Sequence, residues 1–361
     1  MKVIVRQEFR NGLRNPILWA GLVFIFLGLF QILSPYLSLH YFSEEEFARL
    51  EDMDMEHLGD ADVMDGYIPA TKEEQRRVVY QQIYQLFIEE GYPEDKAEEM
   101  TEEIAKKELD ENELEVYLME NYPFYDAYYG ISYYFGLDIR KGTREEVNSY
   151  IQQKLEEHPF SWYFARKFAD FSGLFFSFFS AILLAFLYIR DTKRDMYELL
   201  HTKPIKAAEY IGGKILGGFF ILIFVLAILI AVFEVFCIMA GNSAGLPVDL
   251  MDIPAAALMY VIPNILLIAC VYTIVAVIFK SPFPGVPLLF LHIVYSNMGS
   301  VGADGRYGYY GRPLAIMVRF PGDLLDVAPP PMALLNQCFV IVASVVLFGL
   351  SAMLWKRRRM Y

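Results

Sequence analysis

Two ionisable side chains, Glu234 and His292, lie inside apolar runs of the sequence. Polar groups in such runs mark, by default, a path for a substrate, an ion or a proton. Each lacks an ionisable neighbour, so a hydrogen-bonded packing role is an equally good interpretation. A third such group, Asp170, is explained by an interfacial ion pair with Arg166 or Lys167. No pair of ionisable groups in these runs falls at catalytic spacing, so we expect no catalytic residue in this chain.

Motifs for nucleotide, metal and covalent chemistry are missing from the sequence. It holds no G-x-x-x-x-G-K-[ST] loop, no HExxH, no GxSxG elbow and no cluster of Cys and His at zinc spacing. Residues 59–66, GDADVMDG, lack the alternating ligands and the distal Glu of a calcium loop. We therefore predict that this chain binds no metal and no cofactor, and that any ATP is handled by another subunit.

The composition places the chain in a membrane. Of its 361 residues, 55% are hydrophobic, which is more apolar surface than one soluble core can hide. Apolar runs long enough to cross about 30 Å of hydrocarbon as helix occur at residues 17–39, 168–189, 215–239, 255–279 and 332–355. A sixth run, 286–301, is shorter and contains polar groups that its neighbours must shelter. The predicted fold is an all-α polytopic membrane protein with six transmembrane helices and a helical extracytoplasmic domain inserted between the first and second.

The distribution of charge predicts the orientation. Residues 41–160 hold 32 Asp and Glu against 11 Lys and Arg, although the net charge of the whole chain is only −13. Lys and Arg concentrate in loops that stay in the cytoplasm, so the basic clusters place both termini and residues 190–214 inside and the acidic region outside. Three arginines remain outside as exceptions: Arg306, Arg312 and Arg319. We expect a multi-pass protein of the bacterial plasma membrane with both termini cytoplasmic.

The predicted extracytoplasmic domain, residues 40–166, has the pattern of several short amphipathic helices. Three capping boxes begin helices there: Thr71 with Glu74, Asp110 with Glu113, and Thr143 with Glu146. Gly91 supplies a stop for the first of these helices, and Pro93 can open the next at its first position. These elements are enough for a small domain with its own core.

An aromatic stretch, YPFYDAYYGISYYF at residues 122–135, is the most unusual part of this domain, since 8 of its 14 residues are aromatic. One interpretation is a docking surface for an amphiphilic substrate or for the outer membrane interface, where such rings are favoured. The other, which we favour, is a domain core whose Tyr hydroxyls reach the surface. The candidate contacts are Tyr125, Tyr128, Tyr129, Tyr133 and Tyr134.

The charged stretch at residues 190–214, RDTKRDMYELLHTKPIKAAEYIGGK, separates the second and third apolar runs. Thr192 and Asp195 have the spacing of a capping box, and Pro204 ends the helix that follows. The spacing i, i+3, i+4 gives this helix one apolar face, made of Met196, Leu199 and Leu200. A helix of two to three turns is too short to be stable alone. It needs either the lipid headgroup layer or a groove on a soluble partner to pack against.

The same stretch resembles the permease subunits of type-2 ATP-binding-cassette (ABC) exporters. In that family an E-L-L-x-x-x-P-[IV] segment, followed by G-K, docks into the ATPase subunit. The resemblance implies that the coupling residues are Asp195, Met196, Tyr197, Glu198, Leu199, Leu200, His201, Pro204 and Lys214. A Gly that commonly precedes Glu-Leu-Leu in the family is absent here, which leaves the subgroup open.

The N-terminal segment EFRNGLRNP, residues 8–16, is similar to the cytoplasmic amphipathic helix that leads into the first span of that family. Its candidate residues are Glu8, Phe9, Arg10 and Arg14. The resemblance also implies a partly re-entrant external segment before the last span, where PLAIMVRF at residues 313–320 is apolar enough to dip into the outer leaflet.

The resemblance implies three partners: an ABC ATPase subunit that carries ATP and Mg²⁺, a second permease chain, identical or related, and membrane lipid. No nucleic acid is expected. The chain then divides into residues 1–39, 40–166 and 167–361, with the coupling helix at 191–204. Its implied function is export of an apolar or amphiphilic substrate (peptide, lipid or drug-like) or of an ion. The alternative is a membrane sensor or signalling protein with a ligand-binding external helical domain.

Overall fold

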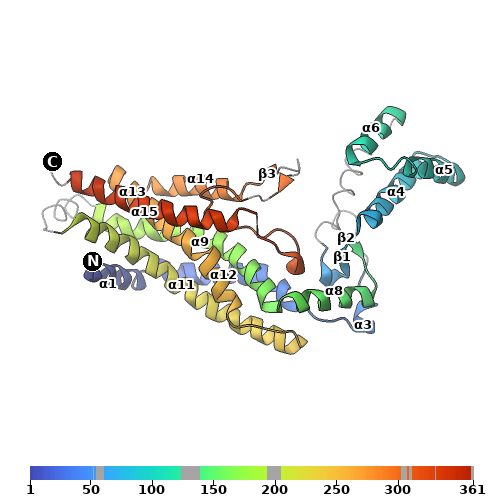
Figure 1. Ribbon diagram of the computed structural model, residues 1–361. Helices are drawn as coiled ribbons and strands as arrows, with labels where there is room; N and C mark the ends of the chain where they lie inside the picture. The colour runs from blue at the N-terminus through green and yellow to red at the C-terminus, as the bar shows by residue number, and fades with distance from the viewer. Residues whose placement is uncertain are drawn as a thin grey trace. The chain divides into compact units, whose positions relative to one another are not determined.

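A computed structural model describes residues 1–51, 53, 61–122, 139–192, 205–301, 307–308, 311–329 and 331–358. The chain divides into two compact units. The membrane unit comprises Met1–His40 and Leu155–Tyr361, and the acidic unit comprises Tyr41–Lys154. Both are mostly helical, as Figure 1 shows.

Five stretches of helix among the described residues are long and apolar enough to cross a membrane. They are α2 (Pro16–Leu33), α9 (Phe160–Thr192), α11 (Ala207–Ala244), the consecutive pair α12 (Asp252–Tyr260) and α13 (Ile262–Phe279), and α15 (Ala333–Arg358). This agrees with the predicted helical polytopic membrane protein. The sixth apolar helix, α14 (Gly285–Asn297), has 13 residues. At 1.5 Å per residue it covers only about 20 Å, so six full-length spans are not confirmed.

Proline sets two helix boundaries in this unit. The first apolar run was expected to reach residue 39, but α2 ends at Leu33 because Pro35 opens the 3₁₀ turn η1 (Pro35–Ser38) instead of continuing the helix. The fourth run is interrupted at Val261, and α13 restarts with Pro263 in its first turn, where the missing N–H leaves no helix bond unmade.

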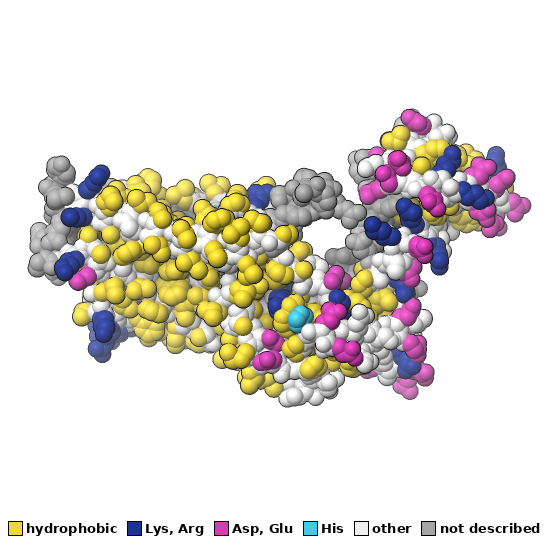
Figure 2. Space-filling model, viewed as in Figure 1, with side chains coloured by type: hydrophobic (Ala, Val, Ile, Leu, Met, Phe, Trp, Pro, Cys, Tyr) yellow, Lys and Arg dark blue, Asp and Glu magenta, His cyan; other side chains and the backbone are white. Residues whose placement is uncertain are grey.

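Helix α9 is the centre of the membrane unit and contacts α2, α11, α12, α13 and α14. In its most apolar window 67% of the residues are buried, against 22% in α2 and in α15. The exposed large side chains of α2 and α15 are therefore suited to face lipid. On the face of this unit that Figure 2 shows, hydrophobic side chains cover most of the surface, and Lys and Arg gather at the end where Figure 1 marks the N- and C-termini.

The other elements of the membrane unit are short. They are α1 (Lys2–Leu13), the ribbon of β3 (Ser300–Val301) with β4 (Tyr307–Gly308), and η4 (Leu324–Asp326). The acidic unit contains α3 (Glu44–Phe47), η3 (Val63–Asp65), α4 (Lys72–Glu89), α5 (Glu94–Ala105), α6 (Glu111–Asn121) and most of α8 (Arg144–Glu157). Its antiparallel ribbon pairs β1 (Tyr67–Pro69) with β2 (Ile139–Lys141). The all-α prediction omitted both ribbons.

Side-chain caps begin the helices of the acidic unit as the sequence predicted. Thr71 and Glu74 bond reciprocally at the start of α4, and the same box recurs with Asp110 and Glu113 at α6. The third box is present at α8, where the N–H of Thr143 donates to Glu146 and the N–H of Glu146 donates to Thr143. Gly91 follows α4 with a φ of 85°, which only Gly adopts without strain. Pro93 is the N-cap of α5, one position earlier than predicted.

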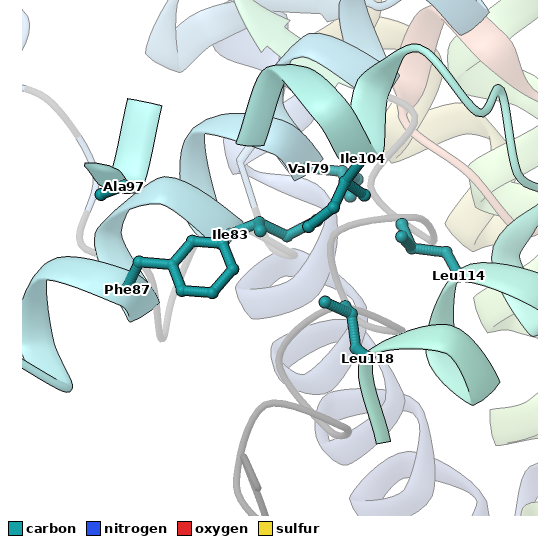
Figure 3. Close-up of a cluster of buried hydrophobic side chains, with 7 residues drawn as sticks. All are labelled: Val79, Ile83, Phe87, Ala97, Ile104, Leu114 and Leu118. Atoms are coloured by element: carbon teal, nitrogen blue, oxygen red, sulfur yellow. The ribbon is translucent and has the colours of Figure 1, made fainter. Parts of the chain in front are cut away.

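A small hydrophobic core holds three of these helices together, as Figure 3 shows. It is formed by Val79, Ile83 and Phe87 of α4, Ala97 and Ile104 of α5, and Leu114 and Leu118 of α6. The Phe87 ring also lies edge-on to Tyr92 and Tyr122, with ring centroids 5.5 Å and 5.1 Å away. The acidic unit therefore has an apolar core of its own.

Removing the Phe87 ring should unfold this core and leave the membrane unit intact. Phe87→Ala removes a fully buried aromatic ring and should destabilise the acidic unit by about 3–5 kcal/mol. Hydrogen exchange of the full chain should show loss of protection confined to α4, α5 and α6. Met119→Ala, on the exposed face of α6, is the matched control and should leave exchange unchanged. Equal protection in both variants would contradict this core.

Acid should weaken the start of α8. The Arg140 side chain and the N–H of Thr143 lower the pKa of Glu146 from 4.5 to about 2. Because the folded pKa is the lower one, this stabilisation is present above pH 4.5 and is lost as the pH falls through about 2. Hydrogen exchange of α8 should therefore depend on pH in this window, and less so in Glu146→Gln. Glu120→Gln, an exposed carboxylate on α6, should keep the wild-type profile.

Candidate functional site

Helix α1 packs against the first half of α11 at a close approach that two glycines permit. Gly213 and Gly217 have the small-x-x-x-small spacing that brings membrane helices together. A Cβ added at Gly217 would lie 2.5 Å from Cβ of Glu8, and one at Gly213 would lie 2.7 Å from Cβ of Ile4. Real Cβ atoms do not approach that closely, so larger side chains at these two positions would push α1 away.

A buried ion pair lies at the centre of this junction. Lys214 Nζ of α11 is 3.1 Å from Glu8 Oε1 of α1, and the two side chains are 2% and 12% exposed. The same ammonium lies 4.8 Å from the centroid of the Tyr188 ring of α9, within the range of a cation–π contact. Because both charges are withdrawn from water, each depends on the other for compensation.

Hydrogen bonding extends this group of residues to a fourth helix. The Thr273 hydroxyl of α13 donates to the carbonyl of Ala269, 2.7 Å away, so its oxygen accepts the proton of the Tyr188 hydroxyl. Glu8, Lys214, Tyr188 and Thr273 thus connect α1, α11, α9 and α13 in sequence. We call these four residues the junction network.

The junction network lies beside the segment predicted to couple. Tyr188 is four residues before the end of α9 at Thr192, and Lys214 is in the second turn of α11, which begins at Ala207. The two helices flank residues 193–204. A displacement of that segment would therefore act on α9 and α11 close to this network.

The predicted site residues fall in three groups. Glu8 and Lys214, predicted in separate segments, are brought together, and Phe9 lies edge-on to Phe224 with centroids 5.9 Å apart. Arg10 and Arg14 are exposed along α1. The remaining coupling residues, Asp195 to His201 and Pro204, and the candidate tyrosines, Tyr125, Tyr128, Tyr129, Tyr133 and Tyr134, lie outside the described residues.

The sequence predictions did not include Tyr188, Thr273 or Gly217. They included Gly213 only as the Gly of the G-K pair and not as a packing residue. The glycines had a usable signal, since Gly213 and Gly217 flank Lys214 in GGKILGG at the spacing of a helix-packing motif. Tyr188 had none, because a Tyr at the end of an apolar run is typical of any membrane interface.

A second polar cluster holds the irregular segment before α15 inside the membrane unit. Residues Ala315 to Val318 are buried although they form no helix. Asp170 of α9 forms an ion pair with Arg319, with 2.5 Å between Oδ1 and Nε, and accepts the N–H of Phe320 at 2.8 Å. The expected pairing of Asp170 with Arg166 or Lys167 is wrong, because Lys167 instead donates to the carbonyls of Phe320 and Gly322.

Helices α14 and α15 satisfy more of this segment's backbone. His292 Nε2 is 2.8 Å from the carbonyl oxygen of Leu314, and the N–H of Ile316 donates to Ser296 at 3.0 Å. Asn336 of α15 donates to the carbonyl of Ala315 at 2.9 Å. This contact fits the hydrogen-bonded packing role, one of the two interpretations of His292 that the sequence left open. Irregular backbone at membrane depth needs this kind of shelter.

Glu234, the other candidate residue inside an apolar run, differs from His292 in its hydrogen bonding. Both of its carboxylate oxygens are buried and form no hydrogen bond with any described residue. No ion pair or hydrogen bond joins it to His292 in the described part of the chain. The described residues also contain no group of three His, Cys, Asp or Glu side chains arranged to hold a metal ion.

These features are those of a multi-pass helical membrane protein. Its helix α1 is held against α11 and, through Lys214, is connected to α9. The family model of the ABC-2 family transporter protein matches residues 2–305. The chain therefore belongs to the ABC-2 transporter family, whose members are permease components of membrane transport. Comparison with curated proteins and with solved structures gives no match.

Removing one charge of the Glu8–Lys214 ion pair should lower the stability of the fold more than removing both charges. Lys214→Met leaves Glu8 buried without its cation and should lower stability by about 3–5 kcal/mol. Glu8→Gln combined with Lys214→Met should recover much of this loss, because no buried charge is left over. Thermal unfolding of the purified chain in detergent measures both effects. Lys356→Met, an exposed charge near the end of α15, is the control. A double variant no more stable than Lys214→Met would contradict the pairing.

Proposed function

We propose that this chain is the membrane-spanning permease subunit of an ABC exporter, and that it couples ATP hydrolysis on a separate ATPase subunit to export. The observation that carries the proposal is the junction network, which ties α1, α9 and α11 together next to residues 193–204. The family assignment supports the transport role, and such families generally work with an ABC ATPase.

In the proposed mechanism, movement of the ATPase subunits is passed through the coupling segment to α9, α11 and α1. Closure of the ATPase subunits around ATP displaces the proposed coupling segment between α9 and α11. The predicted start of this segment at residue 191 is corrected by the structure, because α9 continues to Thr192. Because Lys214 contacts both Glu8 and Tyr188, the ends of α9 and α11 and the whole of α1 move as one body. The spans then switch between two discrete packings, as packed helices do.

The proposed orientation places both termini in the cytoplasm of a bacterial cell. In Figure 1 the N- and C-termini lie at one end of the membrane unit, which requires an even number of crossings. Helix α14 and the sheltered segment after it make the sixth crossing in this proposal. Two of the three exceptions to the charge rule are compatible with this orientation, since Arg319 is paired with Asp170 and Arg312 lies over Tyr295 and donates to the carbonyl of Gly299. The third, Arg306, lies outside the described residues.

The proposed cargo is an apolar or amphiphilic compound, such as a peptide, a lipid or a drug-like molecule, or an ion. Two permease chains, identical or related, enclose the path, and ATP and Mg²⁺ are bound by the ATPase subunits. The tyrosines of residues 122–135 are the candidate external contacts. This part of the proposal rests on the apolar composition of the spans and on the family.

Reversing a charge of the coupling helix, or placing one on its apolar face, should separate the subunits. With the cognate ATPase present, Glu198→Arg or Leu199→Asp should abolish complex formation or the coupled ATP hydrolysis. Glu99→Arg, an exposed glutamate of α5, is the matched charge reversal and should leave both unchanged. Affinity copurification and ATPase turnover of the reconstituted complex measure the two effects.

Two results would overturn the assignment. Normal assembly and turnover in both coupling-helix variants would remove the docking role from residues 191–204. A stable complex with a kinase and none with an ATPase would favour the alternative, a membrane sensor whose external domain binds a ligand.

A further inference from the structure

An apolar groove runs between α1 and α11 on the flank of the junction network. Its volume is about 580 Å³. One wall is made by Met1, Val5 and Phe9 of α1. The other is made by Leu216, Phe220, Ile223, Phe224 and Ala227 of α11. The glycine contact lies on a neighbouring face of α1, at Ile4 and Glu8, so the close approach of the two helices leaves this groove open beside it.

The length of the groove matches one leaflet of a bilayer. Its α11 wall extends from Leu216 to Ala227, which at 1.5 Å per residue is about 16 Å. That is roughly half of the 30 Å hydrocarbon core, the depth that one acyl chain occupies. A single extended acyl chain therefore fits its length.

The rim of the groove is cationic. Lys2 and Arg6 line it from α1, one turn apart, and both are exposed. Neither side chain forms an ion pair or hydrogen bond with any residue in the described part of the chain. An apolar groove with two exposed cations on one of its walls has the chemistry that suits an anionic lipid, which carries a phosphate and a hydrocarbon chain.

We infer that this groove is a binding site for one anionic phospholipid of the leaflet on the side of α1. The phosphate lies between Lys2 and Arg6, and one acyl chain lies along Phe220, Phe224 and Ala227. The lipid contacts both helices of the junction and so strengthens it. The inference needs no ATPase partner and does not depend on the proposed function.

Native mass spectrometry of the full chain, with equal amounts of phosphatidylglycerol and phosphatidylcholine in the detergent, tests this site. The wild type should retain one phosphatidylglycerol in preference to phosphatidylcholine. Since each basic side chain near an anionic lipid is worth about 1 kcal/mol, Lys2→Gln with Arg6→Gln should weaken that binding about 30-fold. Arg10→Gln with Arg14→Gln removes the same charge from the same helix outside the groove, and should keep the bound lipid.

A second variant tests the apolar part of the site. Ala227→Trp fills the groove without changing the charge and should also expel the lipid. Equal retention of the two lipids by the wild type would overturn the inference, and so would equal losses in the two charge variants. A third outcome would also overturn it. If the wild type bound no lipid and Ala227→Trp turned a dimer into a monomer, the groove would be an interface with a second copy of the chain.

Discussion

The close approach of α1 to α11 is the contact on which the candidate site depends. Gly213 and Gly217 leave room on α11 for the side chains of Ile4 and Glu8 of α1, and that close contact buries Glu8 against Lys214. The ion pair follows from the packing, because charges this far from water are tolerated only when they are paired. Once paired, the ammonium is positioned over Tyr188, and α9 becomes part of the same body. The short N-terminal helix is thus fixed to the two spans that flank residues 193–204.

The segment before α15 lies inside the membrane unit although its backbone forms no helix or strand, so its backbone groups need other hydrogen-bond partners. Its amides and carbonyls cannot be left without partners in hydrocarbon. Asp170, Ser296, His292 and Asn336 supply partners from three helices. This explains why Asp170, Ser296, His292 and Asn336 occur in apolar runs of the sequence. It also explains how α14 can be short, because the segment that follows it is sheltered by its neighbours.

Local features of the fold could be predicted from the sequence, and long-range pairings could not. Capping boxes such as Thr71 with Glu74 depend on residues three apart, and apolar runs depend on composition, so both were predicted. Glu8 and Lys214 were each identified as candidates, but in separate segments, because nothing in either segment encodes the distance between α1 and α11. Asp170 was assigned its nearest basic neighbours, whereas the tertiary fold gives it Arg319. The end of α2 before Pro35 and the start of α13 at Pro263 could have been predicted from the sequence, but the predicted spans ran through both positions.

In the proposed mechanism, α1 moves with α11 as one body when ATP binds. Spin labels at Val3→Cys in α1 and Lys206→Cys beside α11, in a chain whose three native cysteines are replaced, measure their separation by pulsed electron spin resonance. The complex with the ATPase is compared without nucleotide and with ATP trapped. We expect the separation within one chain to stay unchanged while the distance between the Lys206→Cys labels of the two permease chains changes. A change in the separation within one chain would contradict it.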